Sequence, residues 1–282
     1  MKLLRFGPLG QERPGLLDPE GSIRDLSGVI SDFDARTLSP EGLSELAAID
    51  LSRLPIVSGQ PRLGAPLPGV SKFVAIGLNF SDHAKESNMA IPSEPVVFMK
   101  APSCLCGPED DVIQPKHSTK MDWEVELGIV IGSKGQYVGV DEALDYVAGY
   151  CVVNDVSERN YQLERGGQWD KGKSFDTFGP VGPYLVTKDE VGDVHDLDMW
   201  LDVNGERMQS GSTRTMIFDC AKLVSYLSEC MTLLPGDIIT TGTPPGVGMG
   251  MKPPRFLKPG DVMTLGIEKL GQQRQRVVPF PG

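Results

Sequence analysis

Glycine and proline interrupt this chain along its whole length. Of its 282 residues, 33 are glycine and 23 are proline. Because proline cannot continue a helix and glycine favours turns, this distribution predicts many turns and short strands in place of long helices. Short apolar runs lie between the turns and do not form a succession of β-α-β units. The chain is therefore predicted to adopt a β-rich α+β fold.

The chain is predicted to divide near residue 70. Residues 1–70 would form a small N-terminal domain and residues 71–282 the main domain, with a connection over 55–68 that is rich in proline and glycine. The first part is expected to contain a strand at 1–6, a hairpin over 15–26 and a helix capped by Ser39. The main domain is expected to contain strands at 72–77, 237–241 and 261–267 and helices at 140–147 and 215–230.

Composition limits the partners of this chain. A net charge of −11 argues against nucleic acid and anionic membranes, which need basic patches, but leaves a small anionic substrate open. The N-terminus lacks an apolar core long enough for a signal peptide, and no window approaches the roughly 18 apolar residues of a membrane span. The five cysteines are odd in number, lack zinc-site spacing and are typical of reduced thiols. We therefore expect a cytoplasmic protein.

Three carboxylates in the middle of the chain suggest a metal site. In Trp123-Glu124-Val125-Glu126-Leu127, apolar and acidic residues alternate, so both glutamates would point to the same side of a strand. Two such carboxylates repel each other unless positive charge lies between them. Together with Asp155 they would suit a hard divalent cation such as Mg²⁺, Mn²⁺ or Ca²⁺. The alternative is a solvated strand face that carries two acids by accident.

A histidine and a glutamate follow the expected strand at 72–77. His83 and Glu86 are three residues apart, which on a helical turn places them within reach of each other. A histidine that is oriented by a carboxylate can take a proton from water as a general base. The alternative is an exposed polar turn. The other two histidines, His117 and His195, are expected at the surface.

Arg159, Gln162 and Lys173 follow Asp155 along the chain. A cation close to a metal site can stabilise an enolate or carboxylate oxygen. Surface exposure is nevertheless the usual state of lysine and arginine, so these residues carry little weight by themselves.

Residues 240–250 form a loop rich in glycine and proline. The loop lacks the Gly-Lys-Ser/Thr ending of a phosphate-binding loop, and its prolines exclude the helix that would follow one. Its backbone N–H groups and the Thr243 hydroxyl could bind a carboxylate. The alternative is a purely structural turn.

Taken together, these motifs resemble the fumarylacetoacetate hydrolase family over about residues 72–280. The motifs that carry the resemblance are Gly77-Leu78-Asn79-Phe80-Ser81-Asp82-His83, Asp122-Trp123-Glu124-Val125-Glu126-Leu127, Asn154-Asp155-Val156-Ser157, Gly172-Lys173-Ser174-Phe175-Asp176 and Thr241-Gly242-Thr243-Pro244. The resemblance implies a fold of mixed sheets with few helices, and a homodimer.

The resemblance also implies the residues of the site. Glu124, Glu126 and Asp155 would hold Mg²⁺ or Mn²⁺, with Ca²⁺ as an alternative. His83 and Glu86 would activate water from a mobile lid. Lys173, with Arg159 and Gln162, would lie at the substrate, and Thr243 at its carboxylate. Residues between Glu86 and Pro95 are expected to select the substrate.

Within the family, residues 1–18 and 154–159 resemble bacterial hydrolases of 2,4-diketo-3-deoxy-L-rhamnonate or L-fuconate, whose relatives are often labelled ureidoglycolate lyase. The resemblance implies hydrolysis of a C–C bond in a 2,4-dioxo acid, a small anionic substrate, with release of pyruvate and a hydroxy acid. Alternatives at the same site are oxaloacetate decarboxylation, acylpyruvate hydrolysis, dienedioate isomerisation and ureidoglycolate cleavage. In a non-enzymatic alternative, the carboxylates hold a structural Ca²⁺.

Overall fold

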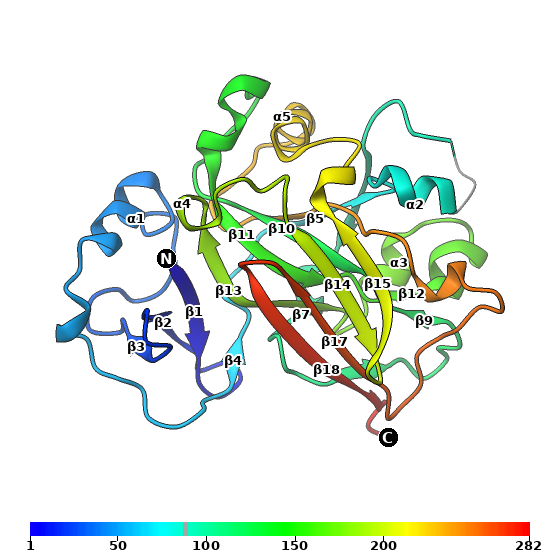
Figure 1. The fold of residues 1–282 in the computed structure, drawn as a ribbon, viewed down its shortest axis with the longest axis horizontal. Coiled ribbons are helices and arrows are strands. Elements are labelled where there is room, and N and C mark those ends of the chain that lie inside the picture. Colours follow the sequence, from blue (N-terminus) through cyan, green and yellow to red (C-terminus); the bar gives the residue numbers. More distant parts are fainter. Residues whose placement is uncertain (87–89) are drawn as a thin grey trace.

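A computed structural model describes residues 1–86 and 90–282 of the chain, and strands dominate it (Figure 1). One sheet has 11 strands and a second has five. The path through the large sheet is β3 (Ile23–Asp25), β2 (Arg13–Leu17), β1 (Lys2–Phe6), β13 (Gly179–Thr187), β11 (Val147–Asn154), β10 (Val125–Ile131), β16 (Ile238–Thr240), β5 (Phe73–Gly77) and β6 (Val96–Lys100), with β4 (Leu63–Gly64) beside β1 and β7 (Leu105–Cys106) beside β13.

The second sheet packs against the first. Its order is β15 (Glu206–Ser212), β14 (Asp198–Val203), β17 (Val262–Ile267), β18 (Gly271–Pro279) and β8 (Val112–Gln114), and a separate pair joins β9 (Met121–Asp122) to β12 (Ser157–Glu158). Parallel pairs such as β5–β16 and β8–β18 lie among antiparallel ones, so the prediction of a β-rich fold of mixed sheets is confirmed. Buried glutamines connect the two sheets. For example, Gln273 Nε2 on β18 donates to the Val152 carbonyl on β11.

Helices are short. The α-helices are α1 (Pro40–Ala47), α2 (Ser81–Glu86), α3 (Asp170–Lys173), α4 (Lys188–Val191) and α5 (Cys220–Cys230). The 3₁₀ helices are Leu51–Arg53, Pro102–Cys104, Val140–Tyr146, Thr213–Thr215 and Gly248–Gly250, and Asn160–Glu164 forms a π-helix. As predicted, Ser39 caps α1, because its side chain accepts a hydrogen bond from Gly42 N. No helix of the described residues is long and apolar enough to cross a membrane.

The helix prediction at 215–230 was wrong at its start. The helix expected at 215–230 begins at Cys220, because Asp219 is extended and caps it by accepting from Lys222 N. The two residues before Asp219 form hydrogen bonds with Asn79 and do not join the helix. Ile217 N donates to the Asn79 carbonyl, and Phe218 N donates to Asn79 Oδ1. The helix expected at 140–147 is present at Val140–Tyr146, as a 3₁₀ helix.

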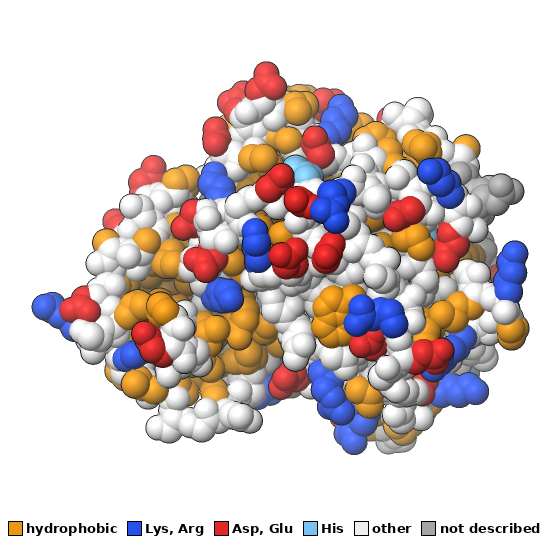
Figure 2. Space-filling view, viewed as in Figure 1, with side chains coloured by type: hydrophobic (Ala, Val, Ile, Leu, Met, Phe, Trp, Pro, Cys, Tyr) orange, Lys and Arg blue, Asp and Glu red, His pale blue; other side chains and the backbone are white. Residues whose placement is uncertain are grey.

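The N-terminal strands belong to the large sheet, since β1 pairs with β13. The division of the chain at residue 70 stays a prediction. Acidic and basic side chains are interspersed on the face drawn in Figure 2, and hydrophobic side chains gather over the N-terminal strands. Of the segment expected to select the substrate, residues 87–89 lie outside the described part of the chain.

The centre of the large sheet has no room for a side chain at Gly149. This residue lies on β11, and a Cβ there would approach the Val186 carbonyl oxygen on β13 to 2.1 Å. We expect Gly149→Ala to lower the free energy of unfolding by about 1–3 kcal/mol, as overpacked interiors do. Gly28→Ala is the matched control, because a Cβ at this exposed residue meets nothing within 4 Å. Urea unfolding should show a lower midpoint for Gly149→Ala alone, and equal midpoints would contradict the prediction.

Candidate metal centre and active site

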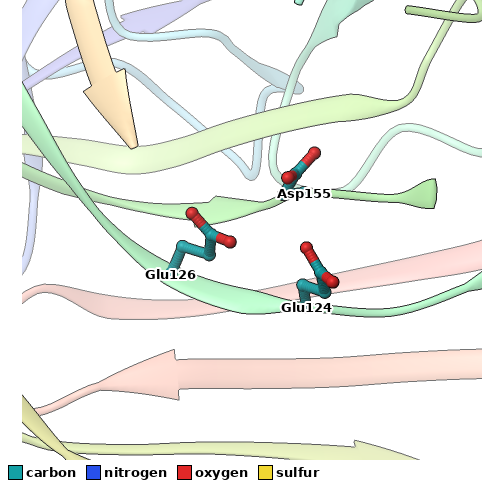
Figure 3. A group of neighbouring side chains, drawn as sticks. All are labelled: Glu124, Glu126 and Asp155. Atoms are coloured by element: carbon teal, nitrogen blue, oxygen red, sulfur yellow. The ribbon is translucent and has the colours of Figure 1, made fainter. Parts of the chain in front are cut away.

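The structure brings the three predicted carboxylates together. Glu126 lies on β10, Glu124 immediately before this strand, and Asp155 immediately after β11. Because β10 and β11 are antiparallel neighbours, the start of one lies beside the end of the other, and Asp155 N donates to the Glu124 carbonyl. One oxygen from each side chain lies within 4.8 Å of the other two, and all three residues are buried. Figure 3 shows the carboxylates converging from these two strands.

Cations surround two of the three carboxylates. Lys173 Nζ lies 2.6 Å from Glu124 Oε2 and 2.5 Å from Asp155 Oδ2. Arg159 Nη2 donates to Glu124 Oε1 at 2.6 Å. Burial alone would raise the pKa of Glu124, but the charges of Arg159 and Lys173 outweigh it and hold the pKa at about 2. Burial would lower the pKa of Lys173, and the charges of Asp155 and Glu124 instead raise it.

Glu126 has a different environment. Its Oε2 accepts hydrogen bonds from Thr240 Oγ1 at 2.5 Å and from Gly242 N at 2.8 Å, both uncharged donors. Burial, followed by the nearby charges of Asp155 and Glu124, raises the pKa of Glu126 well above its ordinary value. A buried set of three carboxylates, one of which lacks a cationic contact among the described residues, fits a hard divalent cation.

Lys100 is a site residue that sequence reasoning missed. Its side chain is fully buried, and Nζ donates to Asp155 Oδ1 at 2.6 Å and to the Lys173 carbonyl. The available signal was the alternation along β6, which places Phe98 and Lys100 on one face and both of them buried. A lysine at a buried position of an apolar strand needs an acidic partner, and here that partner is Asp155.

Asp122 was also missed, although it stands inside the motif that carries the glutamates. It is fully buried and accepts from Arg159 Nε at 2.9 Å, Gly248 N at 2.7 Å and Met249 N at 3.0 Å. Asp122 therefore ties Arg159, a contact of Glu124, to the loop that follows β16.

The same loop reaches the predicted base. On α2, His83 Nδ1 lies 3.3 Å from Glu86 Oε2, as the spacing predicts, and Glu86 Oε2 also accepts from Gly246 N at 3.2 Å. The His83 side chain is 14% exposed, so it is partly shielded from solvent but accessible. Through residues 246–249, hydrogen bonds connect the His83–Glu86 pair to Asp122 and so to the carboxylate cluster.

The remaining predicted residues contact other protein groups. Gln162, on the π-helix, accepts from Arg159 Nη1 at 3.0 Å, and its expected place at the substrate stays a prediction. The Thr243 hydroxyl donates to the Val125 carbonyl at 2.9 Å and accepts from Gln209 Nε2 at 2.8 Å. The substrate role expected for Thr243 stays a prediction. His117 is exposed, and His195 Nε2 accepts from Cys220 N.

The structure combines a β-rich fold with three buried carboxylates that could hold a metal ion, beside a histidine–glutamate pair. Residues 72–278 match the model of the fumarylacetoacetate (FAA) hydrolase C-terminal family, and the chain belongs to this family.

Similar proteins include hydrolases and isomerases. A Burkholderia cenocepacia protein, described only as a candidate hydrolase, is 63% identical over 277 residues, which cover 98% of each chain. The fumarylacetoacetate hydrolase of Exiguobacterium antarcticum is 37% identical, with a TM-score of 0.88 and 99% of each chain covered. A maleylpyruvate hydrolase of Sphingobium, solved with Mn(II) and pyruvate, is 31% identical, with a TM-score of 0.82 and 99% of each chain covered.

Proposed function

We propose that this protein is a metal-dependent hydrolase that cleaves the C3–C4 bond of a 2,4-dioxo acid and releases pyruvate. The observation that carries this proposal is the buried cluster of Glu124, Glu126 and Asp155, with the Lys173 ammonium in contact with two of them. The manganese and pyruvate bound by the Sphingobium relative support both the cofactor and the product. We take Mg²⁺ or Mn²⁺ as the metal, held by the three carboxylates.

The chain's own residues would perform the proton transfer. Glu86 orients His83 through Nδ1, so His83 Nε2 can remove a proton from water. The water oxygen then adds to the C4 carbonyl, the C3–C4 bond breaks, and its electron pair passes to C3 of the departing pyruvate enolate. Arg159 and Lys173 supply positive charge near this enolate. A divalent cation, when bound, would polarise the 2-oxo acid end of the substrate. The proton that His83 took from water passes to C3 and gives pyruvate, and the acyl half leaves as a carboxylic acid.

We further propose a diketo-deoxy sugar acid of the L-rhamnonate or L-fuconate type as the substrate. This part of the proposal rests on the resemblance that the sequence analysis found over residues 1–18 and 154–159. In this case the acyl half would leave as a hydroxy acid such as lactate.

Pyruvate release from a panel of substrates tests the function. The panel contains 2,4-diketo-3-deoxy-L-rhamnonate, the fuconate analogue, acylpyruvates and oxaloacetate, each with Mg²⁺, Mn²⁺, Ca²⁺ or EDTA. We expect pyruvate and a hydroxy acid from a diketo sugar acid with Mg²⁺ or Mn²⁺, and none with EDTA. Pyruvate from oxaloacetate alone would contradict C–C hydrolysis in favour of decarboxylation. Binding of Ca²⁺ without turnover on any substrate or metal would indicate a structural site.

A further inference from the structure

Gln209 connects the second sheet to the strand that carries the glutamates. This residue lies on β15 and is fully buried. Its Oε1 accepts from Val125 N at 2.9 Å, and its Nε2 donates to Thr243 Oγ1 and to the Pro244 carbonyl, both at 2.8 Å. All three polar hydrogen bonds of this amide therefore go to the start of β10 or to the loop after β16.

Thr243 closes a ring with Gln209 around Val125. The Thr243 hydroxyl donates to the Val125 carbonyl at 2.9 Å while it accepts from Gln209. Val125 N and O are thus both bound by side chains. The reason lies in the sheet: β16 pairs with β10 only from Gly128 onward, so Val125 lies beyond the end of that ladder. Gln209 and Thr243 supply the bonds that a neighbouring strand would otherwise make.

The position of Val125 connects this ring to the two glutamates. It is the residue between Glu124 and Glu126, so any shift of its backbone moves both carboxylates. The hydroxyl proton of Thr243 is already donated within the ring, and a hydroxyl has only one proton to donate. A substrate carboxylate would have to break the ring in order to receive it.

We propose that Gln209 and Thr243 are positioning residues that hold Glu124 and Glu126 in place for metal binding. This inference rests on the proposed metal-dependent function. It separates two roles for Thr243: a positioning residue affects metal affinity, whereas a residue that binds the substrate affects KM alone.

The test compares Gln209→Leu, Thr243→Val and the double variant in Mn²⁺ titrations followed by electron paramagnetic resonance, together with KM for the 2,4-dioxo acid. We expect each single variant to weaken Mn²⁺ binding about 10-fold, at the lower end of the effect of groups that orient metal ligands. The double variant should weaken binding little further, because both changes open the same ring. Thr243→Ser keeps the hydroxyl and should bind Mn²⁺ like the wild type.

Gln273→Leu is the matched control. Gln273 is also a buried glutamine of the second sheet, but its Nε2 donates to the Val152, Pro180 and Gly182 carbonyls, away from the glutamates. It should lose stability without losing Mn²⁺ affinity. Wild-type Mn²⁺ affinity in Thr243→Val, with a raised KM, would overturn the inference and restore a substrate role. If Gln209→Leu does not fold, Thr243→Val and Thr243→Ser decide alone. A wild-type protein that binds no Mn²⁺ would overturn the proposed function itself.

Discussion

Replacement of His83 by alanine is expected to lower kcat by about 10²–10⁴-fold and to leave Mn²⁺ affinity unchanged, because a general base contributes this much to turnover. The structure gives the reason for both halves of the expectation. His83 Nδ1 contacts Glu86, which leaves Nε2 to take a proton, and His83 is not one of the three residues whose oxygens converge. The measurements are steady-state pyruvate release and Mn²⁺ titration on the same preparation.

His117→Ala is the matched control for this variant. His117 is exposed and lies near Lys116 and Phe280, away from α2 in the sequence, so its replacement should leave kcat within a factor of two or so. Glu86→Gln should fall between the two, since an amide oxygen can still accept from His83 but no longer carries a charge that stabilises an imidazolium. Normal turnover of His83→Ala on the true substrate would show that another group activates the water.

Local patterns in the sequence predicted the residues that come together at this site, but not the residues that hold them in position. The alternation around Glu124 and Glu126 and the three-residue spacing of His83 and Glu86 depend on strand and helix periodicity, which neighbouring residues determine. The Ser39 cap was readable for the same reason. Each of these features lies within a segment of a few residues.

Lys100 and Gln209 could not be predicted in this way. Lys100 meets Asp155 across 55 positions, and Gln209 meets Val125 across 84 positions. Such contacts arise from the order of strands in two packed sheets, and no local spacing encodes that order. The start of α5 shows the same limit, because Asn79, far along the chain, holds the residues that the helical pattern would have included.

Glu126→Gln is expected to separate metal binding from stability. It should weaken Mn²⁺ binding by more than about 100-fold, since even groups that only orient metal ligands contribute about 10–100-fold. In metal-free protein the same change should leave the melting temperature unchanged or raise it. Glu126 contacts uncharged donors, whereas Lys100, Lys173 and Arg159 contact the other two carboxylates. Glutamine keeps the shape and is always neutral, so it avoids the burial and repulsion that raise the pKa of Glu126.

Glu158→Gln is the control that shows why this outcome is specific to the metal centre. Glu158 is equally buried, but both of its carboxylate oxygens accept hydrogen bonds, Oε2 from Ser118 Oγ and Lys120 N and Oε1 from Lys120 N and Asn160 N. The donors to Glu126 reach Oε2 alone. At Glu158, a glutamine amide would turn N–H groups toward some of its donors, so we expect the free energy of unfolding to fall by about 1–3 kcal/mol and the Mn²⁺ affinity to stay unchanged.

Thermal melts with EDTA and with Mn²⁺ compare the two variants. The wild type should melt higher with Mn²⁺, because an ion that binds only the folded state stabilises it, and Glu126→Gln should lose this increase. A metal-free Glu126→Gln protein that melts well below the wild type would mean that Glu126 stabilises the fold, and that metal binding is not the reason for its burial.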